Sequence, residues 1–257
     1  MPTDRVDFLD VAFDVLPADR LASRIEAVSS DSAFQYLVTP NVDHLVRLHR
    51  RGADVPGLAE AYRRADLCVC DSRVLARLAK WRGVNLPVIT GSDLTASLFE
   101  GVIKDGDRIA IVGGDEAMLD DLRARYPGVR FAQHCPPMGL MRNPDARRAA
   151  AEFIARERAR FTFICVGSPQ QELIAAEAAR MEGGRGMAFC VGAALEFITG
   201  RTKRAPRLAR RLGLEWAHRL ITDPRRLWRR YLVEGPKIFR LARRWKPSPP
   251  PSRGRLT

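Results

Sequence analysis

Short apolar runs alternate with longer amphipathic segments through most of this chain, and this alternation restricts the fold more than any other feature. The apolar runs are bounded by turn-forming or polar residues, as buried strands of a parallel sheet are. They cover residues 34–38, 67–70, 108–112, 161–166 and 187–191. Helical patterns cover residues 42–51, 73–82, 93–103, 116–126, 145–158 and 170–181. Strand followed by helix, repeated in this way, predicts an α/β fold with a mainly parallel, Rossmann-like sheet and helices on both faces.

The positive charge of the chain is concentrated at one end. The 257 residues have a formal net charge of +13, but residues 200–257 alone hold 18 Lys and Arg against 3 Asp and Glu, a net of +15. The first 199 residues have a net charge of −2. This distribution argues against a protein that is basic all over, such as a histone-like DNA coater. We expect an α/β core over residues 1–200, a basic amphipathic helical appendage over 201–245 and a disordered tail over 246–257.

Apolar and aromatic side chains are interleaved with arginines in the predicted appendage, at spacings that fit helices broken near Pro224 and Gly235-Pro236. A solvated face would not need its aromatic residues, which are Trp216, Trp228, Tyr231, Phe239 and Trp245. A nucleic-acid surface would use the charge, but the segment has no recognisable binding motif. An amphipathic segment on an anionic membrane would use both the charge and the aromatic residues. We therefore expect membrane contact and no nucleic acid, and nucleic-acid binding is the alternative hypothesis.

The cysteines and the absence of long apolar segments bear on the compartment. The five cysteines are scattered, odd in number and mostly within apolar runs, which predicts small buried side chains in a reducing compartment. Cys68 and Cys70 have no matching His or Cys pair, so we favour burial over metal binding there. With no signal-like start and no run of about 20 apolar residues, we expect a cytoplasmic protein, peripheral on the inner membrane face.

Polar or glycine-containing stretches follow each predicted strand, where ligands of α/β proteins gather. These stretches are Thr39-Pro40-Asn41, Asp71-Ser72, Gly113-Gly114-Asp115, Gly167 to Glu172 and Gly192 to Glu196. Three contain a glycine at the turn into a helix, which lets backbone amides approach a phosphate. The chain has neither G-x-G-x-x-G nor a P-loop, so a standard dinucleotide or ATP site is not indicated.

Each of these residues also has a purely structural interpretation. Asp115 is most simply the N-cap of the following helix, and Thr39 and Asn41 are able to cap as well. Asp71 is either an N-cap or a carboxylate at the mouth of a cleft, able to take a proton from a hydroxyl. Gln171 and Glu172, beside a glycine and a proline, look more like ligand contacts than caps.

Taken in order, the motifs resemble those of the bacterial WecG/TagA/CpsF glycosyltransferase family, over most of residues 5–235. The most specific are the Pro169-Gln170-Gln171-Glu172 turn and the segment from Arg204-Ala205-Pro206 to Gly213-Leu214-Glu215-Trp216. The resemblance implies an inverting transferase that needs no metal or cofactor. It moves a sugar, N-acetylmannosamine, its uronate or another hexose, from a UDP-sugar to a polyprenyl-diphosphate-linked saccharide in surface polysaccharide assembly. An oligomer is compatible with it.

The resemblance also implies roles for single residues. The family's general base falls on Asp71, and Arg204 and Arg219 are the matching cations for the departing diphosphate. Thr39, Asn41, Gln171, Glu172 and Glu196 match substrate-site positions. Three departures leave the donor sugar open: Ser72 where the family has Gly, Val88 near a family arginine, and Leu195-Glu196 where the family has Phe-Asp.

Overall fold

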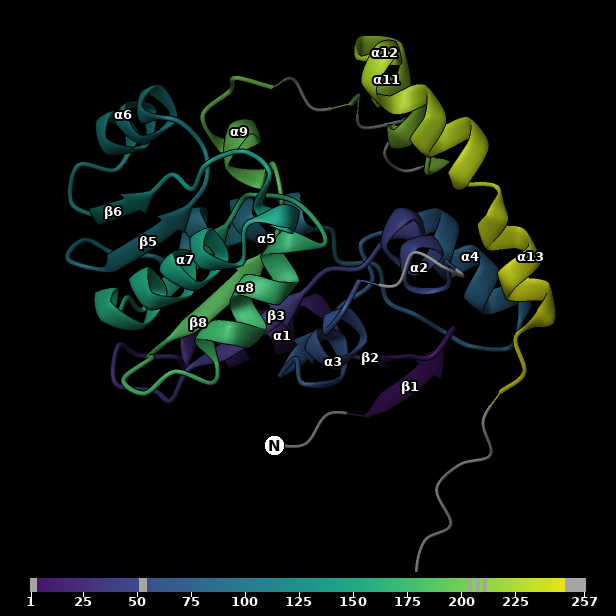
Figure 1. Cartoon of the computed structure of the whole chain (residues 1–257), viewed down its shortest axis with the longest axis horizontal. Helices are drawn as coiled ribbons and strands as arrows, with labels where there is room; N and C mark the ends of the chain where they lie inside the picture. Colours follow the sequence, from purple (N-terminus) through teal and green to yellow (C-terminus); the bar gives the residue numbers. More distant parts are fainter. Residues whose placement is uncertain (1–3, 51–54, 203–204, 207–208, 210–211, 248–257) are drawn as a thin grey trace, which may run out of the picture.

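The computed structural model describes residues 4–50, 55–202, 205–206, 209 and 212–247, and its centre is a six-stranded sheet (Figure 1). In spatial order the strands are β4 (Leu67–Cys68), β3 (Gln35–Val38), β8 (Met187–Cys190), β7 (Phe161–Ile164), β5 (Arg108–Val112) and β6 (Arg130–His134). Every pairing is parallel. The predicted α/β fold is confirmed, and the carboxyl ends of all six strands lie at one edge.

Apolar cores cover both faces of the sheet, and this explains the uninterrupted apolar runs of its strands. Along β3, Tyr36 and Val38 belong to one core and Leu37 belongs to the other, as the alternation of a strand requires. The first core is packed by α2 (Val42–Leu48), α3 (Leu58–Arg63), α4 (Arg73–Trp81), α7 (Pro144–Glu157) and α8 (Gln170–Ala178). The second is packed by α1 (Ala18–Glu26), α5 (Gly91–Ser97), η1 (Leu98–Val102), α6 (Glu116–Arg125) and α9 (Ala194–Ile198).

Three strands were not predicted from the sequence. Strand β6 lies at the edge of the sheet, and its residues are partly exposed and include polar side chains, so it lacks the apolar run that identifies the buried strands. Strands β1 (Arg5–Phe8) and β2 (Val11–Asp14) form an antiparallel hairpin whose turn residues Leu9 and Asp10 have φ of 53° and 57°. Such turns usually contain Asn or Gly, so the usual sequence signal is missing. The Asp14 carboxylate ties the hairpin to the sheet by accepting from the Cys68 backbone at 2.7 Å.

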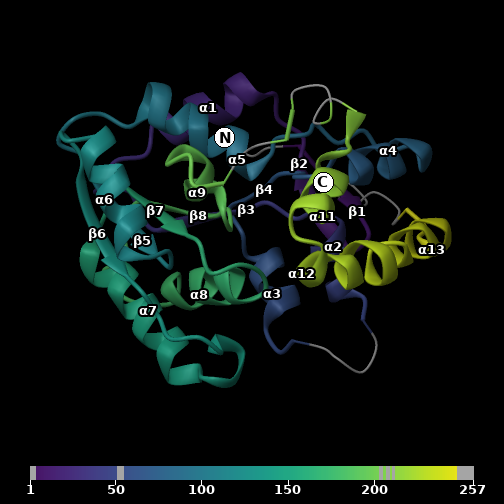
Figure 2. The same ribbon diagram turned by 90° about the horizontal axis from the view of Figure 1, so that it is seen from above.

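The C-terminal helices lie along one side of the molecule, next to α2 and α4 (Figures 1 and 2). They are α11 (Glu215–Thr222), α12 (Pro224–Trp228), the π-helical η3 (Arg229–Glu234) and α13 (Lys237–Arg244). Breaks fall at Pro224 and at Gly235-Pro236, as expected. Residues 203–204, 207–208, 210–211 and 248–257 lie outside the described residues, and with them most of the predicted tail. No described helix has both the length and the apolar character to span a membrane.

One aromatic residue of the expected membrane-facing set belongs to the core instead. Trp245 is only 8% exposed, and its ring meets that of Phe8 edge to face at a centroid distance of 5.1 Å. Its carbonyl accepts a hydrogen bond from Arg82 Nη2 at 2.6 Å. The sequence pattern could not show this, because Phe8 and Arg82 are both far from Trp245 in the sequence.

Candidate functional site

Three segments meet closely at the carboxyl edge of the sheet. The Thr39 hydroxyl, at the end of β3, donates to the Cys190 carbonyl of β8 at 2.9 Å. A Cβ added to Gly91, the first residue of α5, would lie 3.4 Å from Thr39 Oγ1 and from Val191. The glycine therefore lets the start of α5 approach the ends of β3 and β8.

Asp71 lies beside this junction, and its side chain does not cap a helix. The N-cap of α4 is Ser72, whose hydroxyl accepts from the Leu75 backbone at 3.2 Å. The Asp71 amide donates to the Pro40 carbonyl at 3.0 Å, which fixes the backbone, and the Asp71 carboxyl accepts a hydrogen bond from the Gly91 backbone. Of the two interpretations of Asp71, the N-cap is therefore wrong.

The surroundings of Asp71 give its carboxyl an unusual acidity. Burial raises the pKa of Asp71 to about 7, against the lowering effect of the Arg219 charge. Glu215 raises the pKa further, a hydrogen bond from the Gly91 backbone lowers it, and Asp93 raises it. A carboxyl with a pKa close to neutral is suited to accept a proton near neutral pH.

Arg219 connects the C-terminal helices to this edge. Its Nη2 lies 3.0 Å from Glu215 Oε1 on the same helix, and its guanidinium carbon lies 5.4 Å from the ring centroid of Phe197 in α9. The same side chain acts on Asp71 by its charge. Helix α11 thus brings a cation to the carboxyl edge of the sheet.

Gln171 and Glu172 lie behind the site, at 2% and 0% exposure. Gln171 Oε1 accepts from the Gly192 backbone at 3.0 Å, and its Nε2 donates to Glu172 Oε1 at 2.9 Å. Burial raises the pKa of Glu172 and lowers that of the nearby His44 to about 3, so His44 is neutral at pH 7. The two residues hold the turn between β8 and α9 in place, which the sequence pattern of ligand contacts did not indicate.

The other sequence-predicted residues are spread around the same edge. Asn41 caps α2 by accepting from the Asp43 backbone at 3.1 Å. Glu196 is exposed on α9 and accepts from the Thr202 hydroxyl at 2.8 Å. Asp115 caps α6, as expected, by accepting from the Met118 backbone at 2.8 Å. Arg204 lies outside the described residues.

Sequence reasoning missed two arginines close to this edge. Arg47 of α2 donates to the Ser168 carbonyl in the turn between β7 and α8. Arg230 of η3 lies 3.3 Å from Asp43, which also pairs with Arg47 at 3.0 Å. The only local signal was the spacing of Asp43 and Arg47, four residues apart on one helix.

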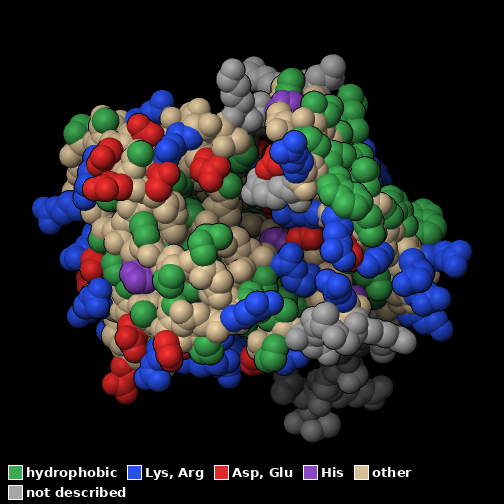
Figure 3. Space-filling model, turned by 45° about the horizontal axis from the view of Figure 1, so that its top comes forward, with side chains coloured by type: hydrophobic (Ala, Val, Ile, Leu, Met, Phe, Trp, Pro, Cys, Tyr) green, Lys and Arg blue, Asp and Glu red, His purple; other side chains and the backbone are tan. Residues whose placement is uncertain are grey.

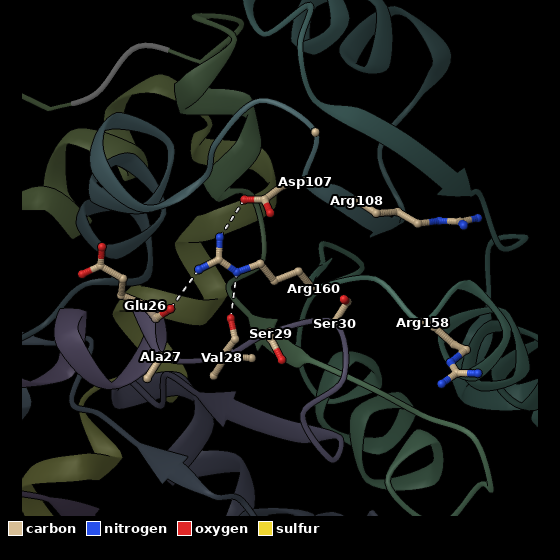
Figure 4. Close-up of a pocket in the computed structure, with 10 residues that line it drawn as sticks. Glu26, Ala27, Val28, Ser29, Ser30, Asp107, Arg108, Arg158 and Arg160 are labelled. Carbon is tan, nitrogen blue, oxygen red and sulfur yellow. Dashed lines mark hydrogen bonds and ion pairs between the residues drawn. The ribbon is translucent and has the colours of Figure 1, made fainter.

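A cavity of about 490 Å³ lies at the opposite edge, around the amino ends of β5 and β7 (Figure 4). Arg160 there donates to the carbonyls of Glu26 and Val28 at 2.9 and 2.8 Å and to the Asp107 carboxylate at 2.8 Å. Its guanidinium is thus used in holding chain segments together. We therefore place the candidate site at the carboxyl edge.

Metal ligands and cysteines add little to the site. In the part of the chain that the structure describes, no three His, Cys, Asp or Glu side chains gather as a group that could hold a metal ion. Cys68, Cys70 and Cys190 are buried as expected, whereas Cys135 is exposed and Cys165 is partly exposed. Cys135 follows the edge strand β6, which the sequence did not reveal.

The comparison with known protein families agrees with the motifs. Residues 6–250 match the family described as the glycosyl transferase WecG/TagA/CpsF family, which is nearly the whole chain. The resemblance drawn from the Pro169 to Glu172 turn and the Arg204 to Trp216 segment is thereby confirmed. The chain belongs to the WecG/TagA/CpsF family of glycosyl transferases.

Proposed function

We propose that this protein is an inverting glycosyltransferase that moves a sugar from a UDP-sugar to a polyprenyl-diphosphate-linked saccharide, without a required metal. The observation that carries the proposal is the Asp71 carboxyl, which lies at the carboxyl edge of the sheet, is not used as a cap and has a pKa of about 7. Membership of the family supplies the reaction class. The sugar is N-acetylmannosamine, its uronate or another hexose, as the departures at Ser72, Val88 and Glu196 leave open.

Asp71 acts as the general base in this proposal. The acceptor hydroxyl attacks the anomeric carbon, the bond from that carbon to the UDP oxygen breaks on the opposite face, and the hydroxyl proton passes to Asp71. The new glycosidic bond therefore has the inverted configuration. A base of this kind is most effective when its pKa lies near the working pH, as that of Asp71 does.

Arg219 and Arg204 are assigned to the departing diphosphate, whose negative charge grows as the bond breaks. Arginine binds phosphate oxygens in a bidentate manner, and a fixed cation at the leaving group lowers the barrier. Asn41 and Glu196 are assigned to the donor, because both side chains reach the surface of the carboxyl edge. Thr39, Gln171 and Glu172 are assigned to holding the turns that the donor contacts, since their side chains are buried.

The C-terminal helices are assigned to docking on an anionic membrane, at the inner face. Large apolar side chains are exposed along them, with Ile221 at 80% and Trp228 at 51%. Figure 3 shows these helices as a hydrophobic band with Lys and Arg side chains beside it. This combination fits interfacial binding, in which apolar side chains enter the lipid and cations meet its phosphates. Nucleic-acid binding by the same basic segment is the alternative.

The test of the proposed reaction is the Asp71→Asn variant of the full chain. UDP release is measured with a panel of UDP-sugars and a polyprenyl-diphosphate-linked acceptor, with and without EDTA. Transfer should fall by at least about a hundredfold while the UDP-sugar still stabilises the protein against heat. Asp115→Asn is the matched control, because Asn also caps a helix. Near-normal turnover of Asp71→Asn would refute the base assignment, and loss of activity in EDTA would refute metal independence.

A further inference from the structure

A second cavity, of about 410 Å³, lies between α2 and η3, and four of its lining residues are arginines. We call it the arginine pocket. It is lined by Asp43, Val46, Arg47, Arg50, Arg229, Arg230 and Glu234. The Asp43 backbone donates to the capping side chain of Asn41. None of the lining residues has been assigned a role in the proposed reaction.

One carboxylate fixes the walls of the arginine pocket. Asp43 Oδ2 lies 3.0 Å from Arg47 Nη2 and 3.3 Å from Arg230 Nε. The two guanidinium groups come from separate elements, α2 and η3, so this shared carboxylate joins the elements and sets the position of both cations. Arg47 is held a second time by the Ser168 carbonyl. The pocket is therefore built before any ligand arrives.

The other two arginines of the pocket, Arg50 and Arg229, have charges that are available to a ligand. Within the described residues, the side chains of Arg50 and Arg229 form no ion pair or hydrogen bond, and their charges lower the pKa of Glu234. That carboxylate is already paired with Lys237 at 2.6 Å. Four guanidinium groups thus face two carboxylates, of which Asp43 is shared by Arg47 and Arg230 and Glu234 is paired with Lys237 from outside the set. A multiply charged anion with several oxygens, such as a diphosphate, is the ligand chemistry that such a set prefers.

The arginine pocket lies between the site and the exposed apolar side chains. Arg47 contacts the turn after β7, at the carboxyl edge where Asp71 also lies. On the other side, η3 carries Leu232 and Val233, both exposed. A ligand in the pocket would therefore have the sheet edge to one side and the proposed membrane face to the other.

We propose that the arginine pocket binds the diphosphate of the lipid-linked acceptor, separately from the donor diphosphate at Arg219. This inference rests on the proposed function for the identity of the acceptor. The lipid tail leaves the pocket along the apolar face of the C-terminal helices, and the saccharide extends toward Asp71. The diphosphate is bonded to the lipid on one side and to the saccharide on the other. Binding it in the arginine pocket therefore limits the positions that the acceptor hydroxyl can reach.

The test is the double variant Arg50→Gln, Arg229→Gln of the full chain, which leaves the Asp43 bridge intact. The control is Arg20→Gln, Arg148→Gln, which removes the same charge from exposed positions on α1 and α7. The KM for the lipid-diphosphate acceptor should rise about tenfold or more in the test variant, with the KM for the UDP-sugar unchanged within about twofold. The control should change neither value. Unfolding temperatures without ligand should agree among all three proteins.

Inorganic pyrophosphate, added with saturating UDP, provides a readout that needs no turnover. It should stabilise the native protein and the control against heat, and the double variant much less. If the native protein transfers no sugar from any UDP-sugar, the proposed function fails, but the pyrophosphate titration still tests the arginine pocket. Equal stabilisation of all three proteins by pyrophosphate would overturn diphosphate binding in the pocket.

Two further outcomes would overturn the assignment to the acceptor. A rise in the KM for the UDP-sugar alone would make the arginine pocket part of the donor site. Weaker binding of the double variant to phosphatidylcholine vesicles containing phosphatidylglycerol, with an unchanged KM for the acceptor, would make it a site for lipid headgroups.

Discussion

The charge of Arg219 on α11 acts on the carboxyl of Asp71 at the end of β4, and it is the strongest of the influences that lower the pKa of that carboxyl. Burial outweighs it, which leaves the pKa at about 7. The Asp71 carboxyl and the positive charge that acts on it most strongly therefore come from different parts of the chain, and removing Arg219 changes the titration of Asp71.

Arg219→Gln should shift the acid limb of the pH–rate profile to higher pH. The proposed reaction requires ionised Asp71, and loss of the neighbouring positive charge should raise the pKa of this carboxyl above about 7. The maximum rate should also fall, because the leaving diphosphate loses a cation. Arg219→Lys should restore the pH of the acid limb, because lysine keeps the positive charge. It should restore the maximum rate less fully, because lysine cannot bind phosphate in a bidentate manner. An acid limb at the same pH in native and Gln forms would contradict the coupling.

The free energy of unfolding should depend on pH, because ionised Asp71 is buried in the folded protein. Because burial raises its pKa from 3.8 to about 7 in the folded state, the folded protein binds this proton more tightly than the unfolded chain does. The contribution of protonated Asp71 is present at low pH and is lost as the pH rises through about 7. Asp71→Asn should therefore raise the free energy of unfolding more at pH 8 than at pH 5, measured by urea denaturation. Equal changes at both pH values would contradict this.

Membrane binding should depend on the outward apolar side chains of the C-terminal helices. Replacing Ile221 and Trp228 by serine removes apolar area worth about 2 kcal/mol per side chain, which corresponds to roughly thirtyfold each in affinity. Sedimentation with vesicles containing phosphatidylglycerol measures the loss. The control is Met138→Ser, which removes a still more exposed apolar side chain from the segment between β6 and η2, away from the C-terminal helices. Undiminished vesicle binding, or tighter binding to duplex DNA at the same ionic strength, would favour the nucleic-acid alternative.

Trp245→Ala should destabilise the fold by about 3 kcal/mol, because it opens a cavity against Phe8. Trp81→Ala, which removes an exposed ring from α4, should cost much less. Urea denaturation compares the two variants. Similar losses for both would show that the Phe8 contact contributes little.

Five of the six strands of the parallel sheet were predictable, because they are buried on both faces and are therefore apolar throughout, whereas the partly exposed edge strand β6 was not. The hairpin of β1 and β2 was not, since its turn at Leu9 and Asp10 uses a left-handed conformation without Gly or Asn. Asp71 and Ser72 are adjacent residues that can both cap, and only the three-dimensional arrangement separates their tasks.

Long-range packing also decided the rest of the site. Gln171 stands beside a glycine and a proline in a pattern typical of ligand contacts, but its side chain is buried and accepts a hydrogen bond from the Gly192 backbone. The arginine pocket joins Arg50 to Arg229, which no local pattern relates. Periodicity therefore gave the scaffold, whereas the contacts between distant segments determined what each polar side chain does.

The position of Trp245 limits how this protein can be dissected. Ile238, Ala242 and Trp245 belong to the same apolar cluster as Phe8 and Tyr36. A chain shortened before α13 would uncover that cluster and become prone to aggregate or to adhere to lipid nonspecifically. Truncation therefore cannot separate folding from docking in this protein, whereas single substitutions on the outward faces of α11 and η3 can.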